Sequence, residues 1–313
     1  MTARRLDGTA VAAEIRAELV PRISSFAKAS GRAPALAIVL AGDNPASQLY
    51  VRNKQRAGIE AGLAVSVLRL PADTTSEAIR ECVEELNQDP GCDGILVQSP
   101  LPAGIPKAAA QRVFDAIAPE KDVDGFHPCN AGLVAQGRPA LAPCTPSGII
   151  ELLVRQEIAI GGSHAVVIGR SEIVGKPMAL LLLHRDATVT ICHSRTKHLP
   201  AIASQADILI AAIGRPGFVT PDFVKPGAVV VDVGITAVED RQKVIELLGA
   251  DSSRLAVFDK KGSIVVGDVH ASVEQVAGAL TPVPGGVGPL TIAMLLKNTL
   301  TAAERRLERR LET

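Results

Sequence analysis

Residues 165–177 read AVVIGRSEIVGKP, a short apolar run followed by a glycine-containing turn and the start of a helix. Strand, tight turn and helix in this order are typical of a dinucleotide-binding fingerprint. Gly169 follows the apolar run and Gly175 begins the predicted helix, but Ser171 stands where the G-x-G-x-x-G pattern has its middle glycine. The turn can still present backbone N–H groups and a helix N-terminus to a phosphate. Similar turns are common, so this stretch alone is a weak indication of a cofactor site, and other residues must indicate the ligand.

The residues after the next predicted strand bear on the kind of nucleotide. An NAD site usually carries an Asp or Glu there, which binds the ribose hydroxyls. This chain has CHSRT at 192–196 instead. A carboxylate would repel a 2′-phosphate, whereas Ser194 and Arg195 would bind it, and Arg170 in the first turn would add a second positive charge. These residues favour NADP over NAD, the alternative being that 193–195 is only a solvated loop.

A second signal lies in the first half of the chain, where the single tyrosine precedes a lysine by four residues. Tyr50 and Lys54 fall in a predicted helix, because Asn44-Pro45 reads as an N-cap followed by proline at the first helical position. A spacing of four places both side chains on one helix face. An aromatic ring beside an amine is better suited to holding a flat ring and moving a proton than to building a core. Together with the cradle, the pair indicates an enzyme that acts on a ring-bearing small molecule with a nicotinamide cofactor.

Three further segments are candidates for ligand contact. Gln98 ends a predicted buried strand, at the sheet edge where parallel sheets host ligands, although it also reads as an ordinary strand-end amide. Asp124 precedes Gly125 and is either a turn residue or a carboxylate that accepts two N–H bonds from an aminopyrimidine edge. The loop 282–289 is so rich in Gly and Pro that backbone can approach a ligand closely, or it is a plain helix-entry turn.

Composition excludes several classes of protein. The 313 residues are 47% hydrophobic and 21% charged, with 33 basic and 33 acidic residues, so nothing in the charge indicates a nucleic-acid partner. No apolar run is long enough to span a bilayer, and the N-terminus does not read as a secretory signal. The five cysteines form no C-x-x-C pair and no zinc spacing, which favours reduced thiols in a cytoplasmic protein and predicts no metal site.

Apolar runs and helical periodicity alternate along the chain, which predicts an α/β protein of two lobes with a cleft between them. The predicted strands lie at 35–41, 63–70, 93–98, 165–169, 187–192, 207–213 and 228–234. The predicted helices lie at 8–29, from 44 onward, and at 75–87, 106–117, 146–156, 175–184, 198–205 and 289–310. The charged stretch 237–262 interrupts this rhythm and is expected to be a surface excursion.

These pieces, in this order, resemble one family, the methylenetetrahydrofolate dehydrogenase/methenyltetrahydrofolate cyclohydrolases. The similarity runs from Asp7-Gly8 to the C-terminal helix. It rests on five segments: ASQLYVRNK at 46–54, DGILVQ at 93–98, KDVDGFHP at 121–128, GRSEIVGKP at 169–177 and PVPGGVGP at 282–289.

The resemblance implies a bifunctional enzyme of one-carbon metabolism and purine biosynthesis. It would oxidise 5,10-methylenetetrahydrofolate with NADP and hydrolyse the methenyl product to 10-formyltetrahydrofolate. It implies a folate-binding catalytic domain of residues 1–145 plus about 289–313, a Rossmann-like NADP-binding domain of residues 146–288, and a C-terminal helix that returns to the first domain. Members of this family are usually dimeric through the second domain, so a homodimer is expected.

The resemblance also implies roles for individual residues. Lys54 would be the catalytic amine, Tyr50 would stack on the substrate, Gln98 would tune Lys54, and Asp124 would hold the pterin edge. The further substrate-binding residues implied are Val97, Ser99, Pro284, Gly285, Gly286, Val287 and Gly288. The cofactor-binding residues implied are Gly169, Arg170, Ser171, Gly175, Ser194, Arg195 and Ile235.

One departure and three alternatives accompany this interpretation. Ser99 stands where such proteins mostly carry Leu, which affects substrate packing beside Gln98. A monofunctional relative with one of the two activities is the main alternative. A short-chain dehydrogenase also pairs Tyr and Lys four apart, but there the glycine-rich turn comes first. A non-enzymatic nucleotide sensor would be expected to lack the pair Lys54 and Gln98.

Overall fold

The structure is a computed structural model that describes residues 2–250 and 252–312, the last three by backbone alone. It divides into two compact units. The three-stranded unit comprises Ala12–Cys144 and Ile292–Thr313, and the six-stranded unit comprises Met1–Val11 and Thr145–Thr291. The chain passes from one unit to the other three times, within α1 (Gly8–Ser30), at the start of α6 (Cys144–Arg155) and within α11 (Val287–Glu312).

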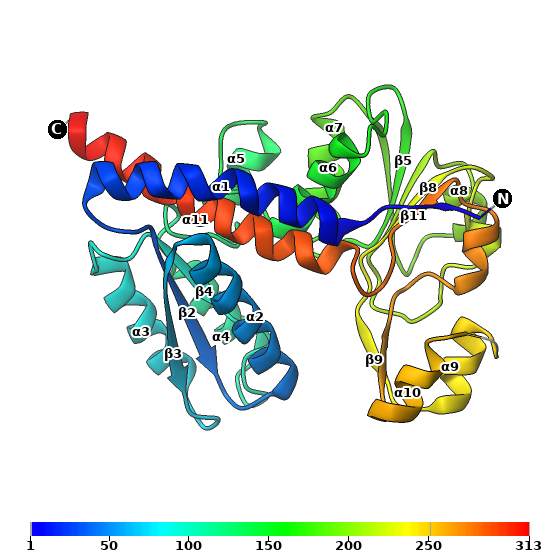
Figure 1. The fold of residues 1–313 in the computed structure, drawn as a ribbon, viewed down its shortest axis with the longest axis horizontal. Helices are drawn as coiled ribbons and strands as arrows, with labels where there is room; N and C mark the ends of the chain where they lie inside the picture. The colour runs from blue at the N-terminus through cyan, green and yellow to red at the C-terminus, as the bar shows by residue number, and fades with distance from the viewer. Residues whose placement is uncertain (1, 251, 313) are drawn as a thin grey trace. The chain divides into compact units, whose positions relative to one another are not determined.

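The three-stranded unit contains a parallel sheet in the order β3-β2-β4. Its strands are β2 (Ala35–Ala41), β3 (Ala64–Leu70) and β4 (Gly94–Val97). Its shorter helices are α2 (Pro45–Ala61), α3 (Ser76–Gln88), α4 (Lys107–Asp115) and α5 (Pro128–Ala135). The long helices α1 and α11 run side by side, joined by an ion pair of 2.7 Å between Arg22 and Glu304 (Figure 1).

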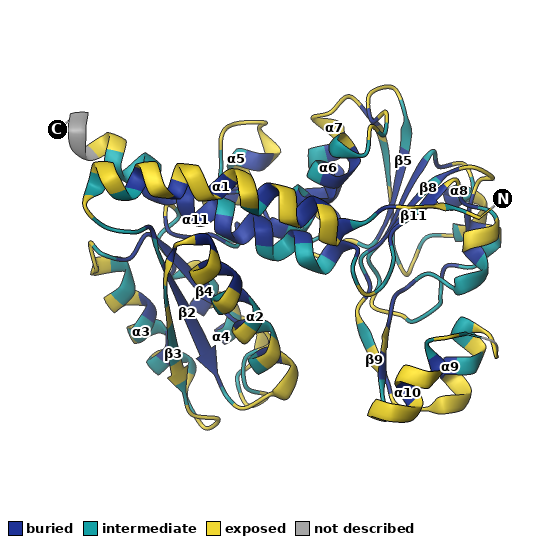
Figure 2. Cartoon of the chain, viewed as in Figure 1, coloured by how far each residue is buried: buried dark blue, intermediate teal, exposed yellow. Residues whose placement is uncertain are grey.

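Both faces of this sheet are covered, as a parallel sheet requires. Val39 and Ile95 point to one face, where they pack in a core with Ile79 of α3 and Val113 of α4. On the other face α2 lies so close that a Cβ at Gly58 would stand 2.6 Å from the Val65 side chain. Figure 2 shows the result: β2 and β4 are buried among helices whose outer sides are exposed, whereas the edge strand β3 is partly exposed.

Local sequence sets both ends of α2. The Asn44 side chain accepts a hydrogen bond of 3.0 Å from the Ser47 N–H, and Pro45 occupies the first turn, which confirms the predicted cap. Gly62 ends the helix with φ of +97°, a conformation that side chains disfavour. The helix that carries the Tyr50 and Lys54 pair is therefore bounded by its own residues.

The six-stranded unit contains a wholly parallel sheet in the order β1-β11-β8-β7-β5-β6. Its strands are β1 (Arg4–Arg5), β5 (His164–Ile168), β6 (Thr188–Cys192), β7 (Ile208–Ala211), β8 (Val229–Asp232) and β11 (Ala279–Leu280). Its helical elements include α6 (Cys144–Arg155), α7 (Gly175–Leu183), α8 (Leu199–Ala203) and the 3₁₀ turns Pro221–Phe223 and Ala271–Gln275. Core residues lie on both faces, with α6 and α7 on one and α8 on the other, so the expected Rossmann-like sheet is confirmed.

The structure adds detail in two places. Residues 2–11, included in the predicted first domain, cluster with the six-stranded unit, because Arg4 and Arg5 pair in parallel with β11. The stretch 237–262 is more than a surface excursion. It contributes to a layer of β9 (Thr236–Val238), α9 (Arg241–Leu248), α10 (Leu255–Lys261) and β10 (Ile264–Val266). A small core that includes Val244 and Phe258 holds this layer together.

Within the described ranges, 2–250 and 252–312, no helix is both long and apolar enough to cross a membrane.

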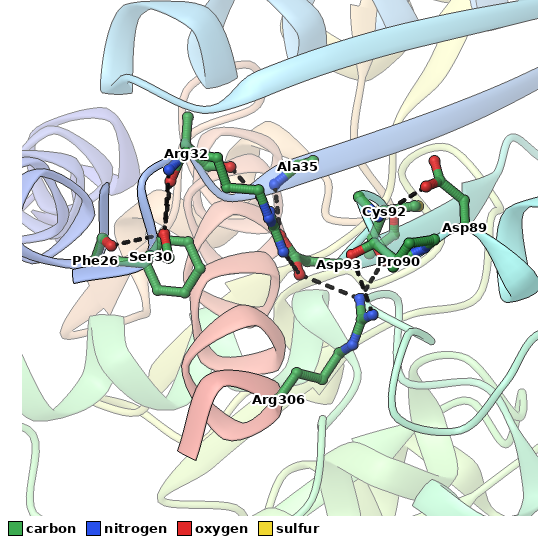
Figure 3. A network of polar contacts seen from close by, with 12 residues as sticks. Phe26, Ser30, Arg32, Ala35, Asp89, Pro90, Cys92, Asp93 and Arg306 are labelled. Carbon is green, nitrogen blue, oxygen red and sulfur yellow. Dashed lines mark hydrogen bonds and ion pairs between the residues drawn. The ribbon is translucent and has the colours of Figure 1, made fainter. Parts of the chain in front are cut away.

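A buried carboxylate ties four elements of the three-stranded unit together (Figure 3). Asp93, at the start of β4, is fully buried and accepts two hydrogen bonds from the Arg32 guanidinium, of 2.6 and 2.7 Å. It also accepts one of 3.2 Å from Arg306 on α11 and one of 2.9 Å from the Ala35 N–H of β2. Bidentate arginine pairs of this kind are strong, and removal of one partner leaves buried charge uncompensated.

We expect Asp93→Asn to lower the free energy of unfolding of the three-stranded unit by about 3 kcal/mol, because two guanidinium groups lose their counter-ion. Urea denaturation followed by circular dichroism measures the change. The matched control is Glu84→Gln, which removes an exposed ion pair with Arg80 and is expected to change stability by less than about 0.5 kcal/mol. Equal losses in the two variants would contradict the structural role of Asp93.

Candidate active site

Lys54 lies on the buried face of α2 and is 7% exposed. Its Nζ donates a hydrogen bond of 3.1 Å to Oε1 of Gln98. The predicted pair of residues is therefore in contact. A carboxylate at this place would form an ion pair with the amine, whereas an amide oxygen accepts an N–H bond from either form of it.

Gln98 is held in the orientation that presents its oxygen to Lys54. Its Nε2 donates to the backbone oxygen of Ser99 at 2.7 Å, and its backbone N–H continues the sheet by donating to Val39 at 2.9 Å. Ser99 itself is exposed. Val97, expected beside the substrate, has its side chain in the core beneath α3 and α4.

A tight loop places Asp124 near Lys54. The Asp122 carboxylate accepts hydrogen bonds from the Gly125 N–H at 3.1 Å, the His127 N–H at 2.8 Å and the Asn130 amide at 2.9 Å. Asp124 is partly buried, and burial raises the pKa of its carboxyl, while the nearby charge of Lys54 acts in the opposite direction. The two groups are therefore close enough to influence each other.

Two residues that the sequence reasoning missed support this loop. Asn298 of α11 donates to the backbone oxygens of Val123 and Ala142, both at 2.9 Å. The Cys144 thiol donates to the same Val123 oxygen at 3.3 Å, and burial raises its pKa well above the usual value. No local pattern indicates Asn298, because its partners lie more than 150 positions earlier in the chain.

Two further side chains complete this face of α2. Tyr50 is half-buried, and burial raises the pKa of its phenol, so the hydroxyl keeps its proton near neutral pH. Ser47 is 3% exposed, and its hydroxyl has no hydrogen-bond partner among the described residues. It precedes Lys54 by seven positions, which is two helical turns on the same face, and this spacing would have indicated it. Together these groups can bind a polar ring and move a proton beside it.

The glycine turn of the six-stranded unit is shaped for a close approach of backbone. Gly169 has φ of +139°, and a Cβ there would stand 2.3 Å from the Ala212 oxygen. A Cβ at Gly175 would stand 2.3 Å from the Gly169 oxygen. The Ser171 hydroxyl accepts from the N–H groups of Val174 and Gly175 at 3.2 Å, which orders the entry to α7. The turn thus forms a cradle at a helix N-terminus, as anion binding requires.

A cavity of about 300 Å³ opens beside this turn, within the six-stranded unit. Its walls come from the ends of β5, β6 and β7, and the residues are Ile168, Gly169, Arg170, Ser171, His193, Ser194, Leu199, Ala212, Ile213, Arg215 and Phe218. Four of the expected cofactor residues therefore meet at one cavity. Arg195 and Ile235 are exposed and are not part of its wall. Arg215 and Phe218 were not predicted.

The loop 284–288 packs against the start of α1 inside the same unit. Gly285 has φ of +102°, and its oxygen accepts from the Thr9 N–H at 3.0 Å. Val287 is 6% exposed in the core, whereas Gly288 has open space where a side chain would begin. Pro284 lines a second cavity of about 360 Å³. The predicted loop is thus ordered by contacts with its own unit.

Two carboxylates, Asp232 and Asp268, are buried in the six-stranded unit. Asp232, at the end of β8, accepts from the N–H groups of Gly234, Asp268 and Val269 at 2.8–2.9 Å. Burial, followed by the neighbouring charge of Asp268, raises the pKa of Asp232 to about 7, against the lowering effect of the N–H donors. A Cβ at Gly267 would stand 1.9 Å from the Asp232 carboxylate, so only glycine fits there.

Among the residues that the structure describes, no group of three or more His, Cys, Asp or Glu side chains could hold a metal ion.

Two family models match this chain. The tetrahydrofolate dehydrogenase/cyclohydrolase catalytic domain matches residues 6–124, and the tetrahydrofolate dehydrogenase/cyclohydrolase NAD(P)-binding domain matches residues 143–307. A bifunctional FolD protein of Koribacter versatilis is 53% identical over 307 residues, which cover 98% of each chain. One from Moorella thermoacetica is 51% identical and is matched over its whole length by 97% of this chain.

Solved structures agree with these matches. The bifunctional FolD methylenetetrahydrofolate dehydrogenase/cyclohydrolase of Campylobacter jejuni superimposes with a TM-score of 0.86 at 41% identity, covering 97% of this chain and 99% of that one. The Trypanosoma brucei enzyme, solved with NADP and an inhibitor, has a TM-score of 0.86 at 39% identity and covers 98% of this chain and 99% of that one.

We expect Asp232→Asn to remove a pH dependence of stability. Because the folded pKa of about 7 exceeds the ordinary value of 3.8, the native state keeps a proton that the unfolded chain releases. The wild type should therefore lose stability relative to the variant, by roughly 1 kcal/mol per pH unit, as pH rises from 4 to 7, with no further change above.

Thermal unfolding of both proteins across this range measures the difference. Asp222→Asn, at an exposed position of the same unit, is the control and should follow the wild type at every pH. A constant difference between wild type and Asp232→Asn would show that Asp232 does not titrate in this range.

Proposed function

Since this chain belongs to the tetrahydrofolate dehydrogenase/cyclohydrolase family, we propose how its residues carry out the two reactions of a bifunctional member. The first is the NADP-dependent oxidation of 5,10-methylenetetrahydrofolate to the methenyl compound. The second is hydrolysis of that compound to 10-formyltetrahydrofolate. Both domains of the family are present and the relatives are bifunctional, so the monofunctional alternative is not favoured.

The contact between Lys54 and Gln98 is the observation that carries the residue assignment. Hydrolysis begins when water attacks the methenyl carbon, and the attacking water must lose a proton. Lys54 is the amine placed to accept that proton and to return it as the folate ring opens. Gln98 orients the amine through one N–H bond and leaves the rest of its hydrogen-bonding capacity for substrate and water.

Asp124 and Tyr50 are proposed to bind the pterin. The Asp124 carboxylate accepts hydrogen bonds from the aminopyrimidine edge, which gives two charge-assisted contacts in one plane. Tyr50, protonated and half-buried, supplies an aromatic face on which the flat ring stacks. The buried hydroxyl of Ser47 has an open hydrogen-bonding capacity on the same helix face.

The turn of Gly169, Ser171 and Gly175 suits NADP, because glycine at 169 and 175 lets the backbone fold tightly against Ala212 and itself at the N-terminus of α7, where a diphosphate is favoured. When bound, NADP accepts the hydride that the bridging carbon of the substrate loses. Arg170 and Ser194 line the cavity and supply a cation and a hydroxyl for the 2′-phosphate. Arg195 follows Ser194 on the surface and adds positive charge at the rim.

The proposal extends to the wider assignment of the chain. The three-stranded unit, which makes up most of the predicted folate domain of residues 1–145 and about 289–313, binds folate. The six-stranded unit, which holds the predicted NADP domain of residues 146–288 and also the edge strand β1, binds NADP. Ile235 and the loop 284–288 contact the ligands. The five free cysteines among the described residues suit a cytoplasmic enzyme. We propose that the protein is a homodimer, and light scattering of the purified protein would measure its molar mass.

We expect the wild type to form NADPH from methylenetetrahydrofolate and to hydrolyse the methenyl compound, both followed spectrophotometrically. Lys54→Met should slow hydrolysis at least about 100-fold, because it removes the proton acceptor, while calorimetry shows unchanged NADP binding. Lys28→Met, at an exposed position of α1, is the control and should keep both activities. Wild-type hydrolysis by Lys54→Met would remove Lys54 from the mechanism.

We expect Asp124→Asn to raise the KM for the folate substrate in both reactions about tenfold, since a neutral amide accepts fewer N–H bonds than a carboxylate. Steady-state kinetics of the two reactions measure the change. Asp115→Asn removes an exposed carboxylate from the same unit and should leave KM unaltered. An unchanged KM in Asp124→Asn would refute the pterin contact.

A further inference from the structure

One buried carboxylate binds the turn after β7, and this turn forms part of the wall of the nucleotide cavity. Asp268 is fully buried, and its Oδ2 accepts from the N–H groups of Ile213 and Gly214 at 2.6 and 3.0 Å. Its Oδ1 accepts from the Arg215 N–H at 2.7 Å. Three successive backbone donors are therefore bound by one side chain. Ile213 and Arg215 both line the cavity.

Contacts with Asp232 and Gly234 fix the position of Asp268 in turn. Its backbone N–H donates to Asp232 at 2.8 Å, and a Cβ at Gly234 would stand 2.6 Å from its carboxylate. No ion pair joins Asp268 to a basic side chain within the described ranges, so its charge is met by backbone N–H groups. Because the Asp268 carboxylate accepts its hydrogen bonds from the turn 213–215, its geometry is that of a residue that positions this turn.

The side chain of Arg215 is held at its other end as well. Its guanidinium lies over the Phe218 ring, 4.3 Å from the centroid, and both residues line the cavity. An exposed arginine normally loses much conformational entropy when it binds a ligand. Here the backbone is fixed by Asp268 and the guanidinium by Phe218, so less of that entropy remains to be lost.

Sheet order indicates which part of the dinucleotide Arg215 meets. β7 and β6 lie on opposite sides of β5. Ser194, which follows β6, lies on the side proposed for the 2′-phosphate, whereas Arg215 follows β7. Arg215 and Ser194 therefore line the cavity on opposite sides of the Gly169 turn, so Arg215 lies away from the proposed 2′-phosphate position. The groups within its reach are the adenine ring and the diphosphate, which NADP and NAD share.

We propose that Arg215 is a further cofactor-binding residue, which contacts the adenosine diphosphate part of the nucleotide, and that Asp268 positions it. This inference rests on the assignment of the six-stranded unit as the NADP-binding unit. A planar guanidinium can stack on adenine or bind a phosphate oxygen, and both contacts are independent of the 2′-phosphate.

Calorimetric titration of wild type and Arg215→Gln with NADP and with NAD tests the contact. We expect both affinities to fall by a similar factor of about ten. Arg241→Gln, which removes an exposed arginine of the same unit outside the cavity, is the control and should bind both nucleotides as the wild type does. Unchanged binding by Arg215→Gln would overturn the proposal, and so would a loss confined to NADP.

Asp268→Asn tests the positioning role. We expect NADP affinity to fall about tenfold, with little further loss when Arg215→Gln is added, because the two residues act on one contact. Hydrolysis of the methenyl compound uses no nicotinamide, so its rate and the circular dichroism spectrum report whether the fold is intact. Additive losses in the double variant would overturn the positioning role of Asp268.

The outcome separates this inference from the proposed function. Failure of the wild type to bind NADP would contradict the assignment of the whole unit. Tight NADP binding by the wild type together with equally tight binding by Arg215→Gln would overturn only the assignment of Arg215.

Discussion

The three-stranded unit depends on one buried hydrogen bond, which the Lys54 amine donates to the amide oxygen of Gln98. Lys54 is 7% exposed, and its bond to Gln98 requires α2 and the carboxyl end of β4 to lie in one register. The Asn44 cap fixes where α2 begins, and the pairing of β2 with β4 fixes where Gln98 emerges. A carboxylate in place of Gln98 would form an ion pair with the amine, whereas the amide oxygen accepts one N–H bond from it.

Buried carboxylates perform the corresponding structural task elsewhere. Asp93 binds two arginines and a backbone N–H, and Asp122 holds the loop that carries Asp124. In the six-stranded unit, Asp232 and Asp268 each accept three backbone N–H bonds at the carboxyl ends of strands. Asp122, Asp232 and Asp268 each fix a loop, whereas Asp93 joins β2 to α11. The precision of both sites therefore comes from side chains that do not themselves touch the proposed ligands.

Prediction from the sequence succeeded where the signal was local. Both parallel sheets, the cap of α2 and the glycine turn were predicted because apolar runs, Asn-Pro and Gly carry short-range information. It missed the edge strand β1, which two arginines form only because β11 is there to pair with them. It also failed for Asn298 and Arg215, whose partners Val123 and Asp268 are brought close only by the fold.

The sequence by itself determined the class of fold, the family and the residue types of the site, since periodicity and short motifs survive without three-dimensional context. Only the tertiary structure decided which of these residues meet. It brought Lys54 to Gln98 across 44 positions and Asp268 to Arg215 across 53, and it left Val97 in the core and Arg195 outside the cavity wall. The physical reason is that hydrogen bonds and burial depend on distance in space, which parallel strands and returning helices set independently of distance along the chain.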